Sequence, residues 1–204
     1  MAHHRKAVAA AVAVNTAIVA VELAAGWKAG SLSLVMDGVH NLSDEMALVL
    51  LYLAFVLPQG LSRNLLRSAN LFNSLGLLAV SGLILWQAVE RFIHPVAVLS
   101  WVPVVVGLGA AAANWAVARL LWRPSRNNAA IRLAYLHNLG DAFASLAPVL
   151  AGVLVGVSGH VFFDPLVAGG IATWIILSTL REVLASRDEL VSPEKLVCGH
   201  AEPD

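Results

Sequence analysis

The sequence predicts an all-α membrane protein, a six-transmembrane-helix bundle with both its N- and C-termini in the cytoplasm. Three observations predict this fold class: an apolar composition, six apolar stretches of spanning length, and an alternating distribution of Lys and Arg. Hydrophobic residues make up 59% of the 204 residues, charged residues only 13%, and the mean hydropathy is +0.77. Soluble domains carry about a quarter charged residues, so most of this chain is expected to lie in lipid.

Six apolar stretches are long enough to cross a bilayer, which takes about 20 residues. Gly, Pro and Ser, which favour turns, lie between successive stretches. The predicted spans cover residues 7–27, 32–57, 70–93, 101–122, 131–157 and 162–184. They form one predicted transmembrane domain over residues 1–184, followed by a short cytoplasmic tail over residues 185–204.

Lys and Arg fall mainly on one side of the predicted bundle. With six spans, only Lys28 and Arg91 lie on the sparse side, and removing any one span destroys the alternation. Cytoplasmic segments carry the excess of Lys and Arg, so both termini are predicted to be cytoplasmic. The residues on the rich side are Arg5, Lys6, Arg63, Arg67, Arg119, Arg123, Arg126, Arg132, Arg181, Arg187 and Lys195.

The first apolar stretch follows Arg5 and Lys6, as the apolar core of a signal peptide would. It is longer than the usual signal-peptide core of about 7–15 residues. Its removal would also destroy the charge alternation. We therefore expect it to be a retained spanning helix.

Overall charge and cysteine content narrow the function classes. The formal net charge is zero, which gives no reason to expect a nucleic-acid partner. Cys198 is the only cysteine, which excludes an internal disulfide and a cysteine-based metal cage within one chain. A Cys-Gly-His sequence ending at His200 is too weak a signal to predict a metal site in the tail.

The second stretch contains the segment VMDGVHNLSDEMALVL, which is polar in its middle. Placing a charged side chain in hydrocarbon costs roughly 2.5–3.5 kcal/mol even on the mildest scales. On a helix, Asp37, His40, Asn41 and Asp44 have the spacing of one face. The cost of placing these polar side chains in the membrane therefore predicts that they bind a partner whose interaction offsets it.

A second polar pentad repeats the pattern. His40–Asp44 reads HNLSD and residues 137–141 read HNLGD, in spans two and five. Each pentad places His and Asp one helical turn apart. Two imidazole nitrogens and two carboxylate oxygens suit tetrahedral Zn²⁺, although imidazole also accepts other transition metals. The predicted metal ligands are His40, Asp44, His137 and Asp141.

Both pentads lie near the middle of the membrane in the predicted spans. A metal ion bound there, without a redox-active ligand set, is expected to be transported cargo. Histidine must lose its proton to bind a metal, so metal and protons compete for the same ligands. Free histidine titrates near pH 6.5, close to the pH of cytoplasm. This competition predicts exchange of metal for protons, with the site open to each side in turn.

The chain resembles the cation diffusion facilitators. The resemblance rests on SLSLVMDGVHNLSD and LHNLGDAFAS, and extends to NSLGLLAVSGLILWQAVERFIHP and FDPLVAGGIATWIIL. It implies a homodimeric zinc/proton antiporter rather than an enzyme, with the four ligands as its transport site. The expected substrate is Zn²⁺, with Cd²⁺, Co²⁺, Fe²⁺ and Mn²⁺ as alternatives, and the expected location is a bacterial inner (plasma) membrane.

The resemblance also has a departure and some open roles. Typical members carry a cytoplasmic C-terminal domain for which this sequence has no room, so we expect either a truncated chain or a naturally short form. Asp37 matches a common acidic position and is expected to support the ligands or a proton path. Glu22, in the first span, is expected to be either a hydrogen-bonded structural group or a functional one.

Two other function classes remain as alternatives. A b-type haem electron carrier would hold haem between His40 and His137, but haem would not require an Asp four residues after each His. An intramembrane metalloenzyme needs an open metal position and a general base, whereas the two pentads fill four positions. The sequence also lacks an H-E-x-x-H motif.

Overall fold

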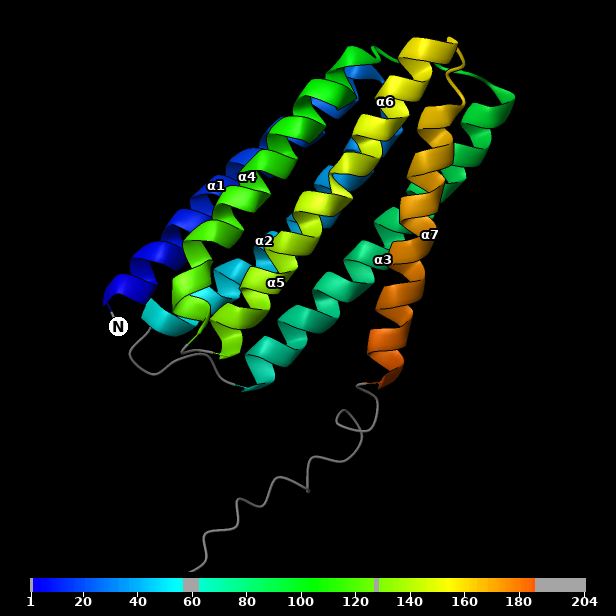
Figure 1. Cartoon of the computed structure of the whole chain (residues 1–204). Helices are drawn as coiled ribbons and strands as arrows, with labels where there is room; N and C mark the ends of the chain where they lie inside the picture. Colours follow the sequence, from blue (N-terminus) through cyan, green and yellow to red (C-terminus); the bar gives the residue numbers. More distant parts are fainter. Residues whose placement is uncertain (1, 57–62, 127–128, 186–204) are drawn as a thin grey trace, which may run out of the picture.

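The structure, a computed structural model, describes residues 2–56, 63–126 and 129–185, and the regular elements within these ranges are all α-helices. This confirms the all-α prediction. α5 continues into α6, and otherwise successive helices run in alternating directions along an elongated bundle (Figure 1). The helices are α1 (Ala2–Ala29), α2 (Leu32–Val56), α3 (Arg63–Ile93), α4 (Trp101–Ser125), α5 (Ala129–Ala144), α6 (Leu146–Ser158) and α7 (Phe163–Ala185).

Within the described residues, five helical segments are long and apolar enough to cross a membrane. α2, which has 25 residues and carries Asp37, Asp44 and Glu45, is not one of these five. The five segments overlap the predicted spans one and three to six, and α2 coincides with span two. They are Val8–Ala29, Leu71–Ile93, Trp101–Ser125, Ala134–Ser158 and Phe163–Arg181.

The fifth predicted span, expected as one helix over residues 131–157, is divided into α5 and α6 at Ser145. Pro148 explains the division, because proline has no N–H to bond to the carbonyl of Ala144 and its ring crowds that carbonyl. Ser145 still donates its N–H to the Asp141 carbonyl at 2.9 Å. The chain direction therefore continues through a local irregularity one turn after Asp141.

The beginning of α2 is held by Asp164, a buried residue in the first turn of α7. Its carboxylate accepts hydrogen bonds from the Leu32 N–H at 2.6 Å and from the hydroxyls of Ser31 and Ser33 at 2.7 and 2.6 Å. Arg91, in the last turn of α3, lies 3.9 Å from the same carboxylate. The first N–H groups of a helix have no acceptor within it, so Asp164 supplies one for Leu32 and joins α2, α3 and α7 at one end.

α4 packs closely against α6 and the end of α5 at two glycines. A Cβ atom at Gly152 would lie 2.6 Å from the Ser100 carbonyl oxygen, and one at Gly107 would lie 2.9 Å from the Ser145 carbonyl oxygen. Small residues at such positions allow two backbones to approach. Glycine is therefore the residue that fits where these helices cross.

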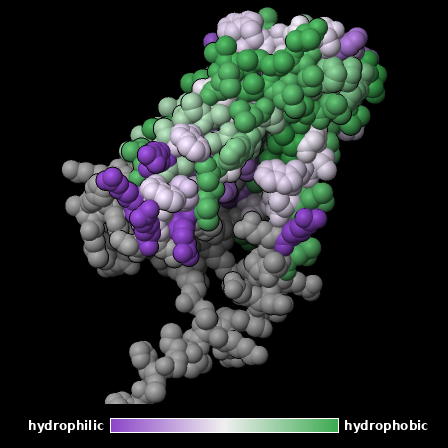
Figure 2. All heavy atoms as spheres, in the orientation of Figure 1, coloured by the Kyte–Doolittle hydropathy of each residue, from purple (hydrophilic) through white to green (hydrophobic). Residues whose placement is uncertain are grey.

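Arginine side chains gather towards one end of the bundle. This end, at which α1 begins and α4 and α7 finish (Figure 1), contains Arg119, Arg123, Arg126, Arg132 and Arg181, and we call it the arginine-rich end. Lys28 and Arg91 lie near the opposite end, where α1 and α3 finish. Figure 2 shows a hydrophobic surface between the two ends on the visible face. Arg187 and Lys195 lie outside the described residues.

Candidate metal centre

The four predicted ligands form one cluster between α2 and α5. One ligand atom each from His40, Asp44 and Asp141 lies within 4.8 Å of the others. His40 Nε2 is 3.6 Å from Asp44 Oδ2 and 3.8 Å from Asp141 Oδ1. His137 joins them through its Nε2, 2.5 Å from Asp44 Oδ1. The two imidazole rings lie edge to face with their centroids 6.4 Å apart.

The cluster is mostly buried and under-satisfied. Asp44 and Asp141 are 6% and 3% exposed, whereas the His137 side chain is 44% exposed. Asp44 Oδ2, Asp141 Oδ2 and His40 Nδ1 are buried and have no hydrogen-bond partner within the described part of the chain. Burying carboxylate oxygens without partners is costly, and a divalent cation bound between them would offset that cost. The donor set of two nitrogens and two carboxylates is one that zinc accepts.

Two other polar side chains of α2, Asn41 and Glu45, contact α1 instead. Asn41 Nδ2 donates to Glu22 Oε2 at 2.7 Å, and the Thr16 hydroxyl donates to Glu45 Oε1 at 2.6 Å. Asn41 was predicted to share the ligand face, but its amide binds the neighbouring helix. The polar segment of α2 thus serves two purposes: one turn faces the cluster, and the positions beside it bind α1.

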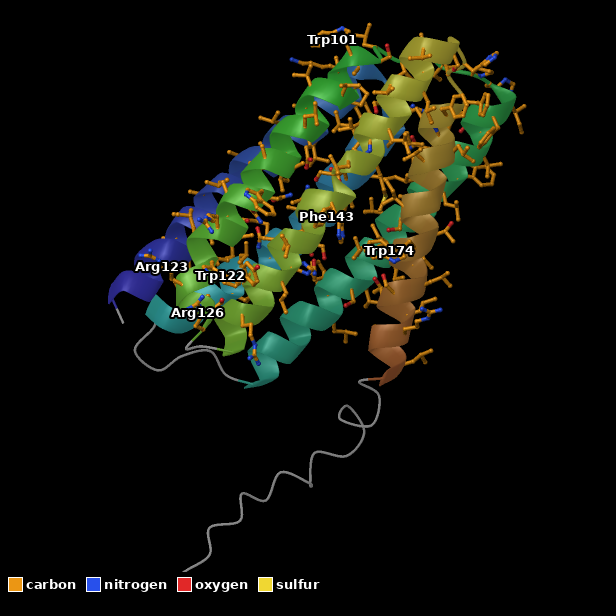
Figure 3. The ribbon with its side chains drawn as sticks, in the orientation of Figure 1. Trp101, Trp122, Arg123, Arg126, Phe143 and Trp174 are labelled. Carbon is orange, nitrogen blue, oxygen red and sulfur yellow. The ribbon has the colours of Figure 1, made fainter. Side chains whose placement is uncertain are left out.

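Trp174 on α7 is a neighbour of the cluster that the sequence analysis did not single out. Its ring centroid lies 5.8 Å from that of His40, at an interplanar angle of 76°. Figure 3 labels Trp174 beside the middle of the bundle. Tryptophan in membrane proteins prefers the interface with water. The position of Trp174 in the middle of an apolar span was therefore the sequence signal that could have pointed to it.

A family model described as the cation efflux transmembrane domain matches residues 8–191. The chain belongs to the cation efflux family. This confirms the predicted resemblance to the cation diffusion facilitators, and together with the apolar helices it identifies the chain as an integral membrane protein.

Several curated bacterial proteins are similar to this family member. A zinc transporter ZitB of Yersinia pestis is 29% identical over 191 residues, which are 89% of this chain and 61% of that protein. A cadmium, cobalt and zinc/H(+)-K(+) antiporter of Bacillus subtilis (strain 168) is 29% identical over 174 residues, or 80% of this chain and 56% of that protein. The zinc transporter ZitB of Escherichia coli (strain K12) is 29% identical over 188 residues, or 87% and 60%. The chain therefore spans about three fifths of the length of the curated relatives it matches.

The cation efflux family is a family of transporters, and these relatives are named as transporters. This supports the prediction that the chain is not an enzyme, and it argues against the metalloenzyme and haem-carrier alternatives.

Glu22 and Asp37 are two further buried acidic residues near the cluster. Glu22 is fully buried and accepts the hydrogen bond from Asn41, but its Oε1 has no hydrogen-bond partner among the described residues. Its role, structural or functional, stays a prediction. Asp37 is 1% exposed, and its Oδ2 has no hydrogen-bond partner among the described residues. A role for Asp37 in supporting the ligands or a proton path stays a prediction. Cys198 and His200 lie outside the described residues.

Proposed function

We propose that this chain exports a divalent metal cation, Zn²⁺ by preference, in exchange for protons, and that His40, Asp44, His137 and Asp141 bind the ion. The observation that carries the proposal is the mostly buried cluster of two imidazoles and two carboxylates between α2 and α5. The names of the relatives, which include zinc, cadmium and cobalt, support the same class of substrate.

The spacing of the ligand atoms favours a small tetrahedral ion. Zinc binds nitrogen and oxygen ligands at about 2.0–2.2 Å, which places tetrahedral ligand atoms roughly 3.4 Å apart. The separations of 3.6 and 3.8 Å between His40 and the two carboxylates are close to this value. The contact of 2.5 Å between His137 and Asp44 is shorter than this value and would have to open. Small side-chain movements would therefore complete the site.

The contact between His137 and Asp44 supports exchange for protons. His137 Nε2 and Asp44 Oδ1 lie 2.5 Å apart, close enough to share a proton. A metal ion bound by both atoms takes the place of that proton, so metal binding displaces it. We propose that the metal leaves the site as protons return to its ligands.

We further propose six membrane spans with both termini on the cytoplasmic side. α2 would be the sixth span, because its polar residues are directed at α1 and α5. The arginine-rich end would then face the cytoplasm, in accordance with the excess of Lys and Arg in cytoplasmic segments. The bacterial origin of the relatives supports a bacterial inner (plasma) membrane.

A homodimer is the assembly that the family resemblance implies, and α3 is the face we propose for it. α3 packs mainly on α7, and its outer side carries exposed apolar side chains over several turns, Phe72, Leu75, Leu83 and Trp86. Leu83→Cys should form a cross-linked dimer in membranes when Cys198 is replaced by Ser. Monomer alone under these conditions would contradict this interface.

The transport proposal is tested by zinc uptake into proteoliposomes that carry an imposed pH gradient. We expect zinc movement coupled to protons moving the opposite way. Asp44→Ala and Asp141→Ala should abolish it, because each removes a charged ligand. Cadmium, cobalt, iron and manganese in the same assay establish selectivity.

Glu45→Gln is the matched control for this experiment. Glu45 follows Asp44 and is 6% exposed like it, but its carboxylate contacts Thr16 on α1. This variant should retain most of the zinc flux. Wild-type flux in Asp44→Ala and Asp141→Ala would remove the proposed site, and flux that ignores the pH gradient would remove proton exchange.

A further inference from the structure

A groove on the surface between α4 and α5 lies near the arginine-rich end. It has a volume of 160 Å³. Its lining combines three aromatic rings, two apolar side chains and one guanidinium, from Trp115, Ala118, Arg119, Trp122, Tyr135 and Leu139. No carboxylate among the described residues lines this groove, which distinguishes it from the metal cluster.

Aromatic rings and an arginine contact one another at the groove. The rings of Trp122 and Tyr135 have centroids 5.3 Å apart. The Arg126 guanidinium lies over the Trp122 ring, with its Cζ 5.1 Å from the ring centroid. Figure 3 labels Trp122, Arg123 and Arg126 together at this end of α4. The groove thus has an apolar wall with positive charge at its rim.

Within the part of the chain that the structure describes, no acidic side chain pairs with the arginines beside the groove. The ion pairs found across residues 2–56, 63–126 and 129–185 involve His40, His137, Arg91 and their acidic partners, and none includes Arg119, Arg123 or Arg126. A ligand that completes this site must therefore bring negative charge. Its remainder must be apolar, because Trp115 and Trp122 are 56% and 40% exposed.

The depth of the groove identifies the kind of ligand. α4 is a candidate span that ends at Ser125, and Arg119 lies six residues earlier, roughly 9 Å along the axis at 1.5 Å per residue. An arginine at this depth extends its guanidinium towards the headgroup region, and Trp and Tyr are enriched there. Basic pockets between spanning helices on the cytoplasmic side suit anionic lipid headgroups.

We propose that this groove binds an anionic phospholipid, with Arg119 and Arg126 paired to its headgroup and an acyl chain against Trp115 and Leu139. A phospholipid supplies charge and hydrocarbon at the required depth in one molecule. The proposal makes no use of the metal ligands, so it stands or falls separately from the transport function.

Native mass spectrometry of the purified full chain in detergent tests the proposal, with phosphatidylglycerol and phosphatidylcholine of identical acyl chains in equal amounts. We expect wild-type protein to retain phosphatidylglycerol in preference. Arg119→Gln with Arg126→Gln should lower the preference roughly fivefold or more. Arg181→Gln, which removes a charge from α7 at the same end of the bundle, is the control and should leave the preference unchanged.

Two further measurements test the headgroup charge and the position of the lipid. Arg119→Lys with Arg126→Lys preserves the charge and should retain most of the preference even if the neutral variant folds poorly. Brominated phosphatidylglycerol should quench tryptophan fluorescence more than brominated phosphatidylcholine, and Trp115→Phe with Trp122→Phe should abolish the difference. An unchanged preference in the neutral double variant, or a groove covered by a second copy of the chain, would overturn the proposal.

Discussion

His137 on α5 and Asp44 on α2 meet at 2.5 Å, between His137 Nε2 and Asp44 Oδ1. This contact joins the two pentads, HNLSD and HNLGD, which are far apart in the chain. It also joins His137, the half-exposed histidine of the cluster, to the buried carboxylate of Asp44. The geometry makes Asp44 the central residue of the cluster, because it contacts an imidazole from each helix.

Neutralising Asp44 should weaken zinc binding strongly. Asp44→Asn preserves the size of the side chain but removes the charge that faces both imidazoles. Replacing a residue that only orients a metal ligand costs about 10–100-fold in affinity, so loss of a ligand should cost at least about 100-fold. Equilibrium dialysis of zinc against detergent-solubilised protein measures this. Glu45→Gln is the control, and equal losses in the two variants would contradict the special role of Asp44.

Trp174 should report on occupancy of the cluster. Its ring lies 5.8 Å from the His40 imidazole, and a Co²⁺ ion bound at His40 would quench its fluorescence because cobalt is paramagnetic. Trp174→Phe should remove most of the cobalt-dependent quenching. Trp27→Phe, in the last turn of α1, should leave it largely intact. If the two variants respond alike, cobalt is bound elsewhere.

Asp164 should contribute substantially to stability. Asp164→Ala leaves the Leu32 N–H and two serine hydroxyls without their acceptor and leaves Arg91 without its carboxylate. Loss of these buried interactions should cost about 2–4 kcal/mol in the free energy of unfolding. Thermal unfolding in detergent, followed by size-exclusion chromatography, measures the change. Asp164→Asn keeps one accepting oxygen and should lower stability less. If the Asn variant is as unstable as the Ala variant, the negative charge of Asp164, and not its capacity to accept hydrogen bonds, provides the stabilisation.

Gly107 and Gly109 offer a matched test of helix packing within α4. A Cβ at Gly107 would lie 2.8 Å from Val149 Cγ2 and 2.9 Å from the Ser145 carbonyl oxygen, whereas one at Gly109 would meet no described atom within 4 Å. Gly107→Ala should lower stability by about 1–3 kcal/mol through overpacking, and Gly109→Ala should be neutral or slightly stabilising. Both are compared by thermal unfolding in detergent. Equal stability of the two variants would mean that α4 and α6 separate easily.

Much of the architecture could be predicted from the local pattern of apolar and charged residues. Apolar runs located the helices to within a few residues for most spans, because the cost of burying backbone and charge in lipid acts on each segment separately. The ligand pairs were readable for a similar reason, since residues four apart lie one turn apart on any helix. The division at Ser145 was not predicted, although Pro148 signals it.

The sequence by itself determined that this chain forms apolar helices and carries two His–Asp turns. Only the tertiary structure decided which side chains meet: Asn41 with Glu22, Trp174 with His40, and Asp164 with the beginning of α2. Helical periodicity sets the relative angle of residues on one helix. It does not set the rotation of that helix or the identity of its neighbours, which depend on how all the helices pack together.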